Sequence, residues 1–264
     1  MLRIQSLTVQ NSLTPAVPQQ VSIWGLPLHL HGDAPSWLLA TQAQHQGCHV
    51  ITLNAEMIML AQNVPELAGV IQEAELVIPD GSGVTFYLWL HGISSERLPG
   101  IELAESLLHK IATDYPSLGV FFYGGGPGIA EEAAQYWQKT LANLNILGTH
   151  CGYHGPEDEA QLKATLADLQ PALILVALGV PRQEYWIAAN RHLCPEAIWI
   201  GVGGSLDIWA GNKNRAPRWL RDNHLEWLYR LYQEPWRWRR MLALPKFAWR
   251  AVKSRFFWAH EVSP

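Results

Sequence analysis

The sequence predicts an α/β fold in which a mainly parallel, Rossmann-like β-sheet lies between layers of helices. Short apolar runs rich in β-branched and aromatic residues alternate with amphipathic stretches of helical periodicity. This alternation is typical of parallel sheets whose strands are joined by helices. The 264 residues, 48% hydrophobic and 16% charged, are also enough to bury one large core.

The expected elements follow one another in a regular order. An alternating segment at 22–30 indicates a strand, and the stretch 35–46 indicates a helix. The expected sheet strands are 49–54, 74–80, 118–125, 146–153, 172–179 and 197–203. The expected crossover helices are 55–72, 101–112, 128–142, 156–169 and 181–192. We therefore divide the chain into an irregular N-terminus at 1–20, an α/β core at 21–212 and a C-terminal appendage at 213–264.

Composition favours a cytoplasmic, peripheral protein. Cys48, Cys151 and Cys194 are scattered and show no CxxC spacing, so neither a disulfide framework nor a zinc site is indicated. The N-terminus lacks an apolar run of signal-peptide length, and the most apolar stretch, 172–180, is too short to span a bilayer.

Polar residues follow the first two core strands, at the sheet edge where ligands of parallel α/β folds bind. Thr52 and Asn54 could bind a sugar or a phosphate oxygen, although Asn54 could instead cap the next helix. Asp80 ends the next strand and is followed by Gly81 and Gly83. A carboxylate on a rigid turn is well placed to accept a proton from an attacking hydroxyl, although an ordinary Asp-Gly turn is the alternative.

The loop after the expected strand 118–125 reads GGGPG and leads into a helix. Backbone N–H groups near a helix N-terminus suit a diphosphate, so Gly125 and Gly126 are predicted to bind one. A dinucleotide fingerprint would need a third glycine where Ile129 stands, and no acid ends the following strand. A nicotinamide cofactor is therefore disfavoured, and we expect no cofactor.

Two further loops carry candidate ligand groups. Gln183 and Glu184 begin a helix after a buried strand and could face a ligand, although Glu184 would also simply favour the helix dipole. Asp207 follows the glycine pair at 203–204 and could accept hydrogen bonds from a uracil or ribose, or cap a helix.

Metal and hydrolase signatures are missing from the sequence. There is no Walker A lysine motif, GxSxG elbow, HExxH or Asp-x-Asp pair. The pair His29 and His31, and the group His150, Cys151 and His154, are better explained as a strand edge and a loop than as metal ligands. We predict no metal.

The C-terminal segment is basic and rich in tryptophan. Residues 213–255 hold 12 of the 19 basic residues and only three acids, and six of the 13 tryptophans lie between 215 and 258. A helix after Pro245 would place Lys246, Arg250 and Lys253 on one face and Trp249 on another, as in helices that lie in a membrane interface.

Other partners for this segment stay open at this stage. Basic residues with aromatics also bind single-stranded nucleic acid, and a subunit interface or packing on the chain's own acidic core are further alternatives. Helical spacing and the lack of glycine favour an anionic membrane surface, so we predict no nucleic acid and allow a homo-oligomer.

The ordered set of motifs resembles the WecG/TagA/CpsF family of bacterial glycosyltransferases. The resemblance runs from about residue 23 to 240 and is carried by TLNAE, VIPDGSGVTF, ERLPGIEL, FYGGGPG, GVPRQE, GVGGSLDIWAGNKNRAPRW and LEWLYRLYQEPWR. It implies an inverting, metal-independent transfer of an N-acetylmannosamine-type sugar from a UDP-sugar donor to a polyprenyl-diphosphate-linked sugar, for cell-surface polysaccharide synthesis. A non-catalytic nucleotide-sugar or nucleic-acid binding module is the alternative.

The resemblance also implies roles for particular residues. Asp80 matches the proposed general base, Thr52 and Asn54 match the donor-site motif, and Gln183 matches the motif glutamine. The C-terminal segment is implied to dock on the membrane at the inner face and to complete the active site. The residues that match the motif arginines are Arg215, Arg230 and Arg237. Where relatives commonly read GxDL, this chain has Glu102, which keeps the carboxylate but is one methylene longer.

Overall fold

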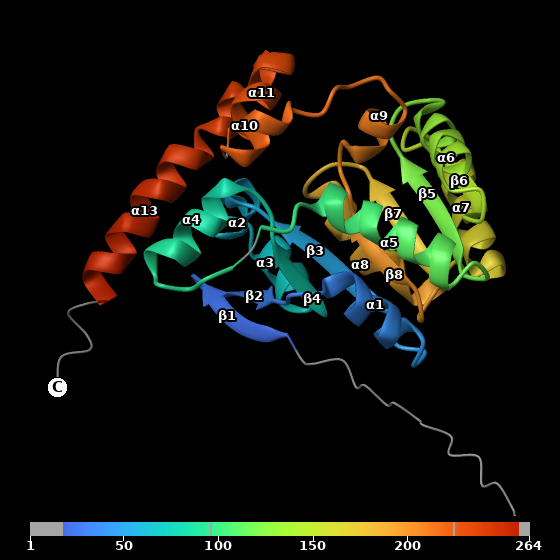
Figure 1. Cartoon of the computed structure of the whole chain (residues 1–264), viewed down its shortest axis with the longest axis horizontal. Coiled ribbons are helices and arrows are strands. Elements are labelled where there is room, and N and C mark those ends of the chain that lie inside the picture. The colour runs from blue at the N-terminus through green and yellow to red at the C-terminus, as the bar shows by residue number, and fades with distance from the viewer. Residues whose placement is uncertain (1–17, 96, 224, 259–264) are drawn as a thin grey trace, which may run out of the picture.

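The computed structural model describes residues 18–95, 97–223 and 225–258. Most of the N-terminal stretch expected to be irregular, and the last six residues of the appendage, lie outside these ranges. Within them, six parallel strands form one sheet in the order β4-β3-β8-β7-β5-β6, which confirms the predicted fold class (Figure 1). The strands are β3 (Cys48–Leu53), β4 (Leu76–Pro79), β5 (Gly119–Gly124), β6 (Asn145–His150), β7 (Leu173–Ala177) and β8 (Ile198–Gly201).

Helices cover both faces of this sheet. Side chains alternate between the two faces along each strand, and both faces carry apolar side chains that the helices bury. In β3, Val50 packs into the core on one face and Ile51 into the core on the other. Helices α1 (Ala34–Gln42), α5 (Gly100–Asp114), α6 (Ile129–Thr140) and α9 (Ser205–Trp209) contribute to the first core. Helices α2 (Ala55–Ala61), α3 (Pro65–Gln72), α7 (Pro156–Leu169) and α8 (Arg182–Asn190), which leads into the short 3-10 helix η1 (Arg191–Leu193), lie on the opposite face.

The expected strand at 22–30 is wrong as a single element, because a tight turn divides this segment between the two strands of a β-hairpin. Strands β1 (Gln19–Ile23) and β2 (Leu26–Leu30) pair antiparallel around Trp24 and Gly25. Both turn residues have positive φ, 48° and 86°, which is the geometry of a tight two-residue hairpin turn. Glycine adopts this φ readily, whereas the tryptophan at the first turn position hid the turn from pattern reading.

The expected helix 55–72 is also wrong as a single element, because it is divided into α2 and α3. Pro65 begins α3, and a proline inside a continuous helix would lack one N–H and clash with the preceding turn. At the first helical position the missing N–H costs nothing. The break therefore follows directly from Pro65.

Helix α4 (Ser82–Leu90) was not expected from the sequence. Its sequence, SGVTFYLWL, has apolar residues on every side and so shows no amphipathic period. Val84, Tyr87 and Leu88 pack into the core, while Phe86 and Trp89 are exposed. The remaining core elements lie close to the expected ranges.

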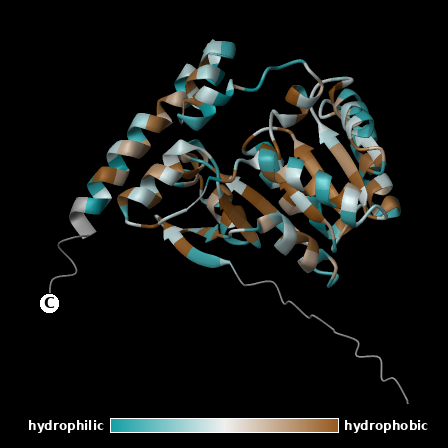
Figure 2. Cartoon of the chain, in the orientation of Figure 1, coloured by the Kyte–Doolittle hydropathy of each residue, from teal (hydrophilic) through white to brown (hydrophobic). Residues whose placement is uncertain are grey.

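The C-terminal segment folds as a series of helices that returns to the core. It comprises α10 (Arg218–Asp222), α11 (Glu226–Gln233), the 3-10 helix η2 (Pro235–Arg237), α12 (Trp238–Met241) and α13 (Ala243–Trp258). Helix α13 begins two residues before Pro245 and runs alongside α4 (Figure 1). Figure 2 shows apolar and polar turns alternating along it.

Helix α13 is anchored through Phe247 and Ala251, which are 1% and 0% exposed and belong to the same core as α2 and α4. Full burial of a phenylalanine side chain contributes about 1.5–3 kcal/mol. Arg250 adds a cation–π contact to Trp24, 4.3 Å from the ring centroid. Of the helices in the described ranges, none is long and apolar enough to cross a bilayer.

Candidate active site

Asp80 lies at the carboxyl edge of the sheet, immediately after β4. Its N–H donates to the carbonyl oxygen of Leu53 at 2.9 Å, which joins the ends of β4 and β3. The parallel register of these strands places Asn54 beside the turn that follows Asp80, as expected for residues at the carboxyl ends of neighbouring strands.

Asn54 caps helix α2, as one of the two sequence interpretations stated. Its Oδ1 accepts a hydrogen bond from the N–H of Met57 at 3.0 Å. The same side chain lines the cavity around Asp80, so Asn54 both caps α2 and faces the cavity. Thr52 is 8% exposed and packs against Gly100 at the start of α5, where a Cβ would lie 2.7 Å from the Thr52 methyl.

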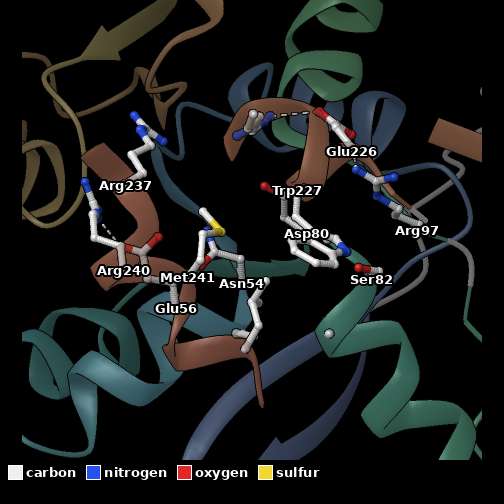
Figure 3. A pocket seen from close by; sticks show the side chains of 15 residues that line it. Asn54, Glu56, Asp80, Ser82, Arg97, Glu226, Trp227, Arg237, Arg240 and Met241 are labelled. Atoms are coloured by element: carbon white, nitrogen blue, oxygen red, sulfur yellow. Dashed lines mark hydrogen bonds and ion pairs between the residues drawn. The ribbon is translucent and has the colours of Figure 1, made fainter. Parts of the chain in front are cut away.

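The Asp80 cavity is a narrow hollow between the sheet edge and the C-terminal helices (Figure 3). Its volume is about 110 Å³, which is below the usual range for small-molecule pockets. Side chains from the sheet edge, from α11 and from η2 to α13 converge on it. Its polar and charged side chains are Asn54, Glu56, Asp80, Ser82, Arg97, Glu226, Arg230, Arg237 and Arg240.

Glu226 holds two arginines on one side of the cavity. It accepts a hydrogen bond from Nη2 of Arg97 at 2.5 Å and another from Nη2 of Arg230 at 2.9 Å. The Glu226 residue is 7% exposed. Burial alone would raise the pKa of Glu226, but the charges of Arg230 and Arg97 hold it below its ordinary value. Two cations are thereby fixed near Asp80 by one buried carboxylate.

Burial raises the pKa of Asp80 to about 6, although the positive charges of Arg230 and Arg97 oppose the rise. The negative charges of Glu226 and Glu102 act in the same direction as burial. A carboxylate with a pKa near 6 is ionised at neutral pH, yet is a stronger base than an exposed aspartate. This combination suits a general base.

Two more arginines lie on the other side of Asp80 (Figure 3). Nε of Arg237 lies 2.6 Å from Oε2 of Glu234, and Arg240 forms an ion pair with Glu56 of α2. The Arg240 pair fixes the C-terminal segment to the core at the cavity wall.

Gln183 and Glu184 are buried beneath the loops that follow β7 and β8. Oε1 of Gln183 accepts hydrogen bonds from the N–H groups of Gly179 and Gly203, each at 3.1 Å. Nε2 of Gln183 donates to Oε1 of Glu184 at 2.8 Å. Burial raises the pKa of Glu184 to about 7. Gln183 thus connects the loop after β7 to the loop after β8. Its contact with a ligand stays a prediction.

Three other predicted residues lie along the same edge but do not line the Asp80 cavity. Gly125 and Gly126 follow β5, which is separated from β4 by three strands, or about 19 Å at the usual strand spacing. The N–H of Gly125 already donates to the carbonyl of Ala177 at 3.0 Å. This N–H is therefore engaged within the fold, and the glycine could only let a ligand come close to the backbone. Asp207 lies in the first turn of α9, and its Oδ2 lies 3.7 Å from Nζ of Lys213.

Arg215 also lies outside the cavity and binds acidic residues of α5. It forms an ion pair with Glu102, and its Nη1 lies 3.7 Å from Glu105. Arg221 approaches the same Glu102 carboxylate at 3.5 Å. Glu102 therefore joins α5 to the C-terminal segment. Packing of the basic tail on its own acidic core, one of the four interpretations of that segment, accounts for these arginines.

The structure thus brings Asp80, Asn54, Arg230 and Arg237 together. Sequence reasoning missed other cavity residues, although two of them stood within quoted motifs: Arg97 in ERLPGIEL and Glu226 in LEWLYRL. The i,i+4 spacing of Glu226 and Arg230 was the available signal. Of the side chains that the structure describes, no group of three or more His, Cys, Asp or Glu could hold a metal ion.

Comparison with known proteins gives consistent matches along most of the chain. A sequence model described as "Glycosyl transferase WecG/TagA/CpsF family" matches residues 21–261. A protein of Bacillus spizizenii strain W23 named N-acetylglucosaminyldiphosphoundecaprenol N-acetyl-beta-D-mannosaminyltransferase is 36% identical over 211 residues, 80% of each chain. A protein of the same name from Bacillus subtilis strain 168 is 33% identical over 211 residues, 80% of this chain and 81% of the relative.

Proposed function

This chain belongs to the glycosyl transferase WecG/TagA/CpsF family, and from this premise we propose that it transfers a sugar from a UDP-sugar to a polyprenyl-diphosphate-linked sugar. The names of both relatives give an N-acetylmannosaminyl group as the sugar transferred and N-acetylglucosaminyl-diphosphoundecaprenol as the acceptor. N-acetylmannosamine is therefore the proposed donor sugar, and synthesis of a cell-surface polysaccharide is the proposed context.

The observation that carries this proposal is the placement of Asp80 among arginines. A partly buried carboxylate with a raised pKa lies in one cavity with Arg97, Arg230, Arg237 and Arg240. Proton abstraction from a hydroxyl and stabilisation of a diphosphate leaving group need these two kinds of residue side by side.

The proposed reaction is a single displacement with inversion. Asp80 takes the proton of the acceptor hydroxyl while that oxygen forms a bond to the anomeric carbon of the donor. The bond from this carbon to the diphosphate oxygen breaks, and UDP leaves with the electron pair. The protonated Asp80 carboxyl then returns its proton to solvent.

Arginine is proposed to supply the positive charge that the departing diphosphate needs. Guanidinium groups present several N–H donors in a plane that matches phosphate oxygens. Arg230 and Arg237 line the cavity beside Asp80, and the charges of Arg97 and Arg230 are close enough to lower the Asp80 pKa. The transfer is accordingly proposed to proceed without a metal ion.

The exposed aromatic residues support docking of the C-terminal helices on an anionic membrane surface, at the cytoplasmic face. Trp219, Tyr232, Trp236 and Trp249 are each more than 60% exposed in this segment. Tryptophan and tyrosine favour the headgroup layer, where their rings are apolar and their polar atoms stay hydrated. That the chain binds no nucleic acid, and that it can form a homo-oligomer, stay predictions from the sequence.

The test is UDP release by the purified protein, supplied with UDP-N-acetylmannosamine or other UDP-sugars. Each donor is measured with and without a short-chain lipid-diphosphate-N-acetylglucosamine acceptor, in the presence of EDTA. We expect release that depends on the acceptor and resists EDTA. Release from no donor, or binding of oligonucleotides in preference to anionic liposomes, would favour a non-catalytic binding module.

A further inference from the structure

A large apolar groove, here called the aromatic groove, runs between α4 and the C-terminal helices. Its volume is about 1130 Å³, slightly above the range for small-molecule pockets. Its apolar lining includes Phe86 and Trp89 of α4, Trp227 of α11, Trp238 and Met241 of α12, and Leu242.

The walls of the aromatic groove expose large apolar side chains to solvent. On α4, Trp89 is 71% exposed and Phe86 is 36% exposed, and their rings stack with centroids 6.1 Å apart. On the opposite wall, Trp238 and Leu242 are 53% and 47% exposed. Exposed apolar side chains gathered around a hollow mark a binding site, because water contact with them is unfavourable.

The aromatic groove lies directly beside the Asp80 cavity. Ser82, Arg97, Trp227 and Met241 line both hollows. An occupant that enters from the groove would therefore reach the arginines at one end while the rest of its length touches apolar side chains. The two hollows together suit a molecule with an anionic head and an apolar chain.

We propose that the aromatic groove binds the isoprene units nearest the diphosphate of the lipid-linked acceptor. The inference rests on the proposed function, because it takes the acceptor to be a prenyl diphosphate. A single prenyl chain fits a concave groove better than a flat bilayer surface does, and the shared lining residues place such a chain next to the Asp80 cavity. Recognition of the acceptor then includes its lipid, and not only its sugar.

A binding measurement with isoprenyl diphosphates tests the proposed prenyl site without requiring catalytic turnover. The full-length protein is titrated calorimetrically, without vesicles or detergent, with inorganic diphosphate and with isoprenyl diphosphates of 5, 10 and 15 carbons. Burial of one methylene strengthens binding by about fourfold, so we expect the Kd to fall by at least tenfold from the shortest to the longest chain.

The paired variant Trp89→Gln, Leu242→Gln should lose this dependence on chain length, while its affinity for inorganic diphosphate stays unchanged. Both side chains are exposed, so the substitutions should leave the fold intact. The matched control is Trp249→Gln, which removes a 72% exposed tryptophan of α13 that does not line the groove. The control should keep the full dependence on chain length.

Equal affinity for all chain lengths in the wild-type protein would overturn the proposal. It would indicate that the prenyl chain of the acceptor stays in the bilayer. A chain-length dependence that survives in the paired variant, or is lost in Trp249→Gln, would overturn it as well. Absence of UDP release alongside a normal dependence on chain length would instead count against the transferase activity, so the two failures are distinguishable.

Discussion

Replacement of Asp80 by asparagine should make the protein more stable at neutral pH while it abolishes transfer. Asp80 is held in a site where burial disfavours the ionised carboxylate, as its raised pKa of about 6 reflects. Asparagine has nearly the same shape and no charge, so it removes the cost of burying that charge. As the proposed general base, Asp80 should contribute about 10²- to 10⁴-fold to the rate.

The expected gain follows from the difference between the ordinary Asp80 pKa of 3.8 and the value of about 6 in the fold. Each pKa unit corresponds to 1.36 kcal/mol, so the gain is at most about 3 kcal/mol. The native state binds the proton more tightly than the unfolded state, so wild-type stability falls as the pH rises from about 3.8 to 6. The advantage of the variant should therefore be complete above pH 6 and vanish near and below pH 3.8.

Urea denaturation of both proteins at several pH values between 4 and 8 measures this directly. At neutral pH the melting temperature should also rise, by at most about 6–12 °C for a chain of this size. An equal stability gain at pH 4 and pH 7.5 would refute the reasoning, since it could not come from a buried charge. No gain at neutral pH would also refute it, as would full transferase activity of the variant.

Two further substitutions test the charges around this site. Glu226→Gln removes a charge that raises the Asp80 pKa, so the acidic limb of the kcat/KM profile, expected at an apparent pKa of about 6, should move to lower pH; an unmoved limb would count against Asp80 as the base. The same change breaks the buried pair with Arg97 and should destabilise the fold by about 3–5 kcal/mol, measured in urea. Glu102→Gln weakens the ion pair with Arg215, which is partly exposed, so stability should change by at most about 1 kcal/mol. Trypsin should nevertheless cleave near residue 215 faster than in the wild type, and an unchanged cleavage rate would show that this pair does not hold the C-terminal segment.

Local pattern was sufficient for the sheet and for most of its helices. Buried parallel strands are continuous apolar runs, and β3, β5, β7 and β8 were recognisable as such. The same reasoning placed Asp80 and Asn54 at one edge, because the carboxyl ends of parallel strands meet there. The family followed from motif order, since several weak motifs in a fixed sequence are jointly specific.

Elements without a regular hydrophobic period were not predicted from the sequence. Helix α4 is apolar on all sides because one face packs on the core while Phe86 and Trp89 line the aromatic groove, so no amphipathic signal is present. The hairpin turn at Trp24 was hidden because tryptophan rarely has a positive φ.

The sequence by itself determined the fold class, the family and the position of Asp80, because these depend on local periodicity and on motif order. Only the tertiary structure decided which arginines reach Asp80. Arg230 and Arg237 turn into the cavity, whereas Arg215 binds Glu102 and Glu105 on α5 instead. Contacts such as that of Arg215 with Glu102 join residues more than a hundred positions apart, so they depend on how the C-terminal segment packs on the core. Buried side chains such as Phe247 of α13 are part of that packing.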